Sequence, residues 1–208
     1  MSAFLGPIHY WLYNKIKIQQ SLVEDIITLS QEINAIEIDL KNELDARYGV
    51  SETRPLEEAI DKGNIHGWLQ TCVSQAEYKL AYGVTLLLKS NPELLKNIEE
   101  LFQNKGKEQS LSQSTNNASE IYKAISDSLL DGMPCDHANS VLEENEARVI
   151  WKRNTCVHKD YWDEVGGDIN NYYILREAFI KGFLSSLPVK FIKTNEVTSM
   201  IERVDINE

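Results

Sequence analysis

Apolar residues recur at helical spacing through the N-terminal part of the chain. The series is Leu22, Ile26, Leu29, Ile33, Ile36, Leu40 and Leu44. Its steps alternate between four and three residues until a last step of four, close to the 3.5-residue repeat of packed helices. Pro7 suits a helix start and Gly49 suits a helix end. The pattern predicts one long helix over residues 8–48, or two collinear helices broken near Gln19 and Gln20.

Three more helix starts follow. Pro55 opens a short helix, Asn64 caps a longer one, and Asn91 begins a third. Residues 105–117 are poor in apolar side chains and rich in Ser, Asn and Gln, which is typical of a polar linker. We therefore expect a helical bundle over residues 1–104.

The pattern changes beyond the linker. β-Branched and aromatic residues flank a polar tip at residues 143–146, which predicts a β-hairpin within residues 140–157. A helix is the alternative in that segment. Asp168 or Asn170 caps a last long helix, which ends at Pro188.

The expected fold class is α+β and predominantly α. A helical bundle carries a small α/β portion, a β-hairpin plus a long helix, at the C-terminal end. Residues 118–208 form this portion and pack on the bundle, so that the two parts make either two domains or one. A chain of 208 residues is long enough to bury a real core in either arrangement.

Charge and composition narrow the partners. The formal net charge is -11, and no cluster of Lys and Arg forms a basic face. Binding to nucleic acid or to an anionic membrane needs such a face, so neither partner is expected. No stretch approaches the roughly 20 apolar residues of a membrane span. The three cysteines are too few for a disulfide scaffold and favour a reducing, cytoplasmic location.

Several sequence motifs are absent. The chain contains no phosphate-binding P-loop, no G-x-G-x-x-G dinucleotide fingerprint and no G-x-S-x-G elbow. It also lacks the H-E-x-x-H and C-x-x-C patterns. No nucleotide cofactor is therefore expected.

A repeated Cys-x-His pattern is the main candidate for chemistry. It occurs as Cys135 with His137 and as Cys156 with His158, on either side of the expected hairpin. In an extended segment, residues two apart point to the same face, so two such pairs could present a tetrahedral ligand set. Zinc or iron suits these ligands, and haem is less favoured. Because zinc ligands are usually two to four residues apart, the alternative is two small buried cysteines and two hydrogen-bonded histidines.

His9 is a further candidate ligand. It lies in an aromatic stretch at the first helix start, where it could ligate haem or join the Cys/His cluster. The alternative is an ordinary amphipathic helix start.

Aromatic and charged residues near the C-terminal helix suggest a ligand pocket. Trp162 and Tyr173 could form apolar walls, and Arg176 could bind a carboxylate. The alternative is that the aromatic residues are core anchors and that Arg176 pairs with a local acid.

Three functional hypotheses follow. The first is a cytoplasmic small-molecule or metal-binding protein, a sensor or a small enzyme, that uses the Cys/His cluster. The second is a helical interaction protein that forms a homodimer through the Leu22–Leu44 series. The third is a cysteine-dependent hydrolase or transferase in which Cys156 is activated by His158 or His137.

Overall fold

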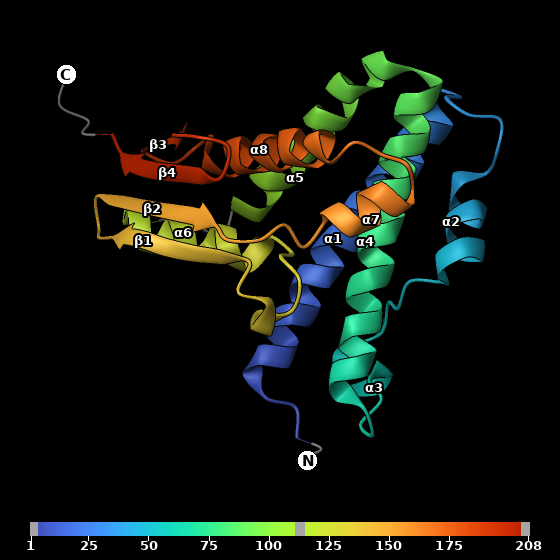
Figure 1. Ribbon diagram of the computed structural model, residues 1–208, viewed down its shortest axis with the longest axis horizontal. Coiled ribbons are helices and arrows are strands. Elements are labelled where there is room, and N and C mark those ends of the chain that lie inside the picture. The colour runs from blue at the N-terminus through green and yellow to red at the C-terminus, as the bar shows by residue number, and fades with distance from the viewer. Residues whose placement is uncertain (1–3, 111–114, 205–208) are drawn as a thin grey trace.

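The computed structural model describes residues 4–110 and 115–204, and it confirms the predicted α+β, predominantly helical fold (Figure 1). The helices are α1 (Pro7–Glu32), α2 (Leu40–Tyr48), α3 (Leu56–Ala59), α4 (Ile65–Ser90), α5 (Leu95–Ser110), α6 (Ala118–Ser128), α7 (Lys159–Glu164) and α8 (Ile169–Leu184). The strands are β1 (Asn139–Glu144), β2 (Arg148–Arg153), β3 (Val189–Lys193) and β4 (Thr198–Arg203). None of the described helices has both the length and the apolar character needed to cross a membrane.

Helices α1 and α4 form the long axis of the helical part and lie side by side (Figure 1). Apolar side chains that recur on one face of each helix meet between them, because burial of that face removes it from water. Ile16 of α1 and Val73 of α4, for example, belong to one buried cluster and are 0% and 1% exposed. The two helices run in the same direction, since α2 and α3 carry the chain back to the lower end.

The prediction of one continuous N-terminal helix is wrong, and so is the alternative of a break near Gln19 and Gln20, because α1 runs through both residues. Helix α1 ends at Glu32, and Asn34 has a positive φ of 49°. Asp39 then caps α2 by accepting a hydrogen bond from a backbone N–H. Leu40 and Leu44 are buried, whereas Ile33 is 40% exposed. The series therefore belongs to two helices within one monomer, and the uninterrupted seam on which the dimer hypothesis depends is missing.

Helices α5 and α8 cross at very close range. A Cβ placed on Gly106 of α5 would lie 2.0 Å from the carbonyl oxygen of Phe179, and one on Gly182 of α8 would lie 1.9 Å from that of Gln103. Two glycines thus allow one backbone to rest directly on the other. This crossing connects the helical part to the helix that carries the site described below.

The predicted linker overlaps helix α5. That helix continues to Ser110, while residues 111–114 lie outside the described part of the chain and α6 begins at Ala118. One hydrophobic core includes Leu80 of α4, Phe179 of α8 and Ile201 of β4. The division into residues 1–104 and 118–208 stays a prediction.

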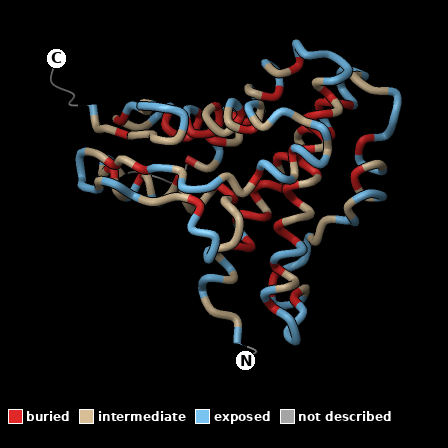
Figure 2. Tube along the Cα trace, in the orientation of Figure 1, coloured by how far each residue is buried: buried red, intermediate tan, exposed pale blue. Residues whose placement is uncertain are grey.

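The strands form one antiparallel sheet in the order β1-β2-β4-β3. The predicted hairpin is confirmed as β1 and β2, and the tail adds β3 and β4. Side chains alternate across the sheet, so Val149, Trp151 and Ile201 are buried on the face covered by α6 and α8. Figure 2 shows the contrast between this buried layer and the exposed strand ends and turns.

Candidate functional site

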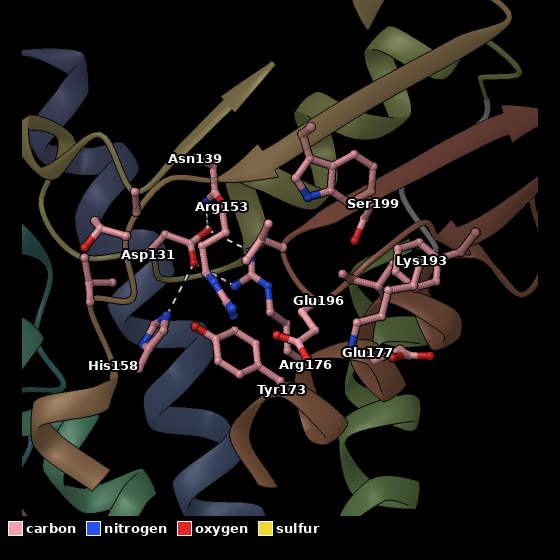
Figure 3. Close-up of a pocket in the computed structure, with 17 residues that line it drawn as sticks. Asp131, Asn139, Arg153, His158, Tyr173, Arg176, Glu177, Lys193, Glu196 and Ser199 are labelled. Atoms are coloured by element: carbon pink, nitrogen blue, oxygen red, sulfur yellow. Dashed lines mark hydrogen bonds and ion pairs between the residues drawn. The ribbon is translucent and has the colours of Figure 1, made fainter. Parts of the chain in front are cut away.

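Four charged side chains from distant parts of the chain form a buried network. His158 precedes α7, and its Nδ1 lies 3.0 Å from Oε2 of Glu77 on α4. Its Nε2 lies 3.5 Å from Oδ1 of Asp131, in the loop after α6. Arg176 of α8 donates two hydrogen bonds to Asp131, of 2.7 and 2.9 Å. Figure 3 shows Asp131 between His158 and Arg176.

Each of the two carboxylates also accepts a hydrogen bond from a neighbouring amide. Gln19 of α1 donates to Oε1 of Glu77 at 3.0 Å, and Asn139 of β1 donates to Oδ2 of Asp131 at 3.0 Å. A buried charge is tolerated when it is paired and hydrogen-bonded in this way. The network therefore ties α1, α4, α8 and the start of the sheet together.

The network holds His158, Asp131 and Arg176 in their charged forms. Burial lowers the pKa of His158, but the charge of Glu77 and the hydrogen bond to Asp131 outweigh it and raise that pKa to about 9. Burial raises the pKa of Asp131, but Arg176 and His158 outweigh it and hold that pKa well below its usual range. At neutral pH His158 is an imidazolium that donates to Glu77 and forms an ion pair with Asp131, so it is not available as the base for a cysteine nucleophile.

The fold is expected to lose the stabilisation due to His158 in alkaline solution. The pKa is 6.5 for an ordinary histidine and about 9 here, so this stabilisation is complete below about pH 6.5 and is lost as the pH rises through about 9. Between about pH 6 and pH 10, the free energy of unfolding measured with urea should fall by about 3 kcal/mol more in wild type than in His158→Gln. Lys15, whose pKa burial lowers to about 8, titrates in both proteins and drops out of the difference. Glu77, Asp131 and the ring of Tyr172 face His158. If wild type and His158→Gln lost the same free energy of unfolding, His158 would not be charged in the folded protein.

A pocket lies directly on this network, between α8 and the helix-covered face of the sheet. Asp131, His158 and Arg176 form part of its lining. Trp151, Phe191 and Ile180 contribute apolar surface, and the remaining residues are Ala138, Asn139, Arg153, Thr155, Val157, Tyr173, Glu177, Lys193, Glu196, Val197 and Ser199. The pocket has a cavity volume of about 60 Å³, measured as the space open to the centres of water-sized groups. That is well below the roughly 300–1,000 Å³ of pockets for drug-sized molecules, so it suits a small compound.

Arg153 is the cation of the pocket that has no carboxylate partner among the described residues. Its guanidinium carbon lies 3.8 Å from the ring centroid of Tyr173, which fixes the planar group by a cation–π contact. By contrast, Arg176 is paired with Asp131, and Lys193 lies 3.8 Å from Glu177. The pocket therefore holds one oriented guanidinium whose hydrogen-bond donors remain free of an acid.

The Cys/His metal hypothesis is wrong. Cys135 and His137 are exposed on a short 3₁₀ turn (Pro134–Asp136) and the residue after it, so the segment is not extended as the hypothesis required. Cys156 accepts a 2.9 Å hydrogen bond from the Tyr173 hydroxyl, while His158 belongs to the buried network. Of the described residues, no group of three or more His, Cys, Asp or Glu side chains could hold a metal ion.

The other predicted site residues fall in different places. His9 accepts a 3.0 Å hydrogen bond from the backbone N–H of Gly6 at the start of α1, and its ring lies 5.7 Å from that of His66. Trp162 is 0% exposed in the helical core and does not line the pocket. Tyr173 and Arg176 both line it.

Three residues of the site were missed from the sequence. Glu77 had a readable signal, because it stands on the apolar face of α4 between Val73 and Leu80, where an acid needs a buried partner. Asp131 and Arg153 had none. Their roles depend on which loops and strands meet at the end of the sheet.

Comparison of the chain with protein-family models, curated proteins and solved structures finds no match.

Proposed function

We propose that the protein binds a small organic anion in the pocket between α8 and the sheet, with Arg153 as the anchor. The observation that carries this proposal is the guanidinium of Arg153, stacked on Tyr173 and without an acid partner in the described part of the chain. Guanidinium groups bind carboxylates through two parallel hydrogen bonds, and a fixed orientation reduces the entropy lost on binding.

The surroundings of Arg153 support recognition of this kind. The floor of the pocket is held by the Asp131–Arg176 pair, so its charges are fixed before a ligand arrives. Trp151 and Phe191 offer apolar surface to the rest of a ligand. A small number of oriented polar groups in a mainly apolar recess is typical of small-molecule sites. This proposal uses neither a metal nor the cysteines.

The experiment is a calorimetric titration with small carboxylates and their neutral amides. Wild type should bind a carboxylate such as benzoate more tightly than benzamide, and Arg153→Gln should weaken benzoate binding by roughly tenfold or more, since a hydrogen bond to a charged group contributes about 1.5–3 kcal/mol. Arg47→Gln is the matched control, because Arg47 also lies over a tyrosine ring, that of Tyr82, but outside the pocket. An acid that binds no better than its amide would refute the proposal.

A further inference from the structure

The charges around the pocket divide into paired and unpaired groups. Asp131 is paired with Arg176, and His158 is paired with Glu77 behind the pocket wall. Glu177 lies 2.9 Å from Lys181 and 3.8 Å from Lys193. Asp131 and Glu77 each offset one cation, whereas Glu177 is shared between Lys181 and Lys193.

Two charged residues of the lining remain without an ion-pair partner in the described part of the chain. One is Arg153 at the end of β2, and the other is Glu196, an exposed residue in the turn between β3 and β4. The backbone N–H of Arg153 donates a 2.8 Å hydrogen bond to the carbonyl oxygen of Val197, so this turn is attached beside Arg153. Figure 3 shows Glu196 among the side chains around the pocket, together with Tyr173 and Arg176. The pocket therefore offers one free positive group and one free negative group.

The apolar lining lies on both sides of the recess. Trp151 and Phe191 come from the sheet, with ring centroids 6.1 Å apart, and Ile180 comes from α8. Trp151 is only 6% exposed, so its position is fixed by packing. These side chains give the recess an apolar side, and an apolar group that rests on it gains from removal of its surface from water.

We infer that the ligand is a monocarboxylate with a compact apolar body, and that Glu196 excludes ligands with a second negative charge. This inference rests on the proposed function and adds the charge and class of the ligand. Arg153 neutralises one carboxylate. A second carboxylate or a phosphate group would find Arg176 paired with Asp131 and Lys193 beside Glu177, and it would face the carboxylate of Glu196. Like charges in a partly desolvated recess repel, and the net charge of -11 adds to that repulsion.

Three aromatic probes separate charge from size. Benzoate carries one negative charge, phthalate carries two, and monomethyl phthalate has one charge with at least the bulk of phthalate. We expect wild type to bind both monoanions at least tenfold more tightly than phthalate, and inorganic phosphate to bind weakest. Glu196→Gln should tighten phthalate binding by roughly tenfold and change benzoate binding by less than about threefold. Glu146→Gln, in the exposed turn at the opposite end of the β1–β2 hairpin, should change neither.

These measurements test anion binding at Arg153 separately from the exclusion of dianions by Glu196. Phthalate binding as tightly as monomethyl phthalate, or unchanged by Glu196→Gln, would overturn the inference about ligand charge. The proposed function would still stand if Arg153→Gln weakened every acid. If no acid bound more tightly than benzamide, both the proposed function and the inference would fail.

Discussion

Gly182→Ala is expected to lower the free energy of unfolding by about 3 kcal/mol, and Gly106→Ala by a similar amount. The new methyl group on Gly182 would lie 1.9 Å from the carbonyl oxygen of Gln103, and the one on Gly106 would lie 2.0 Å from that of Phe179. Both obstacles are helix backbone, which cannot rotate away as a side chain does. Relief requires α5 and α8 to separate, and this would open the core between them. Guanidinium denaturation followed by tryptophan fluorescence measures the loss.

The matched control is Gly83→Ala in the interior of α4. A Cβ on Gly83 meets Ile26 at 3.5 Å, which is ordinary van der Waals contact. Alanine is a better helix former than glycine, so this variant should be more stable than wild type by about 1 kcal/mol. If Gly182→Ala matched the stability of Gly83→Ala, the close crossing of α5 and α8 would be wrong.

Asp131→Asn is expected to destabilise the protein by about 3–5 kcal/mol. Arg176 would keep its charge in a place where its side chain is only 15% exposed, and it would lose its bidentate acid partner. His158 would lose one of its two carboxylates as well. The same denaturation experiment measures this loss.

Two further variants test the cause of that loss. Asp163→Asn removes an ion pair with Lys159 in which the side chains of Asp163 and Lys159 are 53% and 54% exposed. Exposed ion pairs contribute roughly 0–1 kcal/mol, so this variant should lose little stability. The double variant Asp131→Asn with Arg176→Gln removes both charges and should recover part of the stability. Full additivity of the two single losses would show that Asp131 and Arg176 act independently, against the network described here.

Local patterns were sufficient for much of the fold. Asn and Asp signals located the starts of α4 and α8, where Asn64 and Asp168 accept hydrogen bonds from backbone N–H groups as helix caps do. β-Branched residues around residues 143–146 located the β1–β2 hairpin. Each signal acts over a few residues, so it can be read without knowing what packs against it.

The apolar series of residues 22–44 shows the limit of prediction from local sequence patterns. Its spacing was right for helices, and Leu22, Leu29, Leu40 and Leu44 are indeed buried. Spacing alone does not distinguish one long helix from two that fold back within a monomer. That choice depends on α4, because α1 and α2 both bury their apolar faces there. The partner surface is supplied by residues 65–90, far along the chain.

By itself, the sequence determined the fold class, the hairpin and the last helix. Only the tertiary structure decided which charges meet. Glu77, Asp131, His158 and Arg176 come together because α4, α8 and two loops converge at one end of the sheet. Electrostatic pairing depends on distance in space and on burial, and neither can be read from residue spacing. For the same reason, Cys135 and His158 looked like partners in the sequence and belong to different environments in the fold.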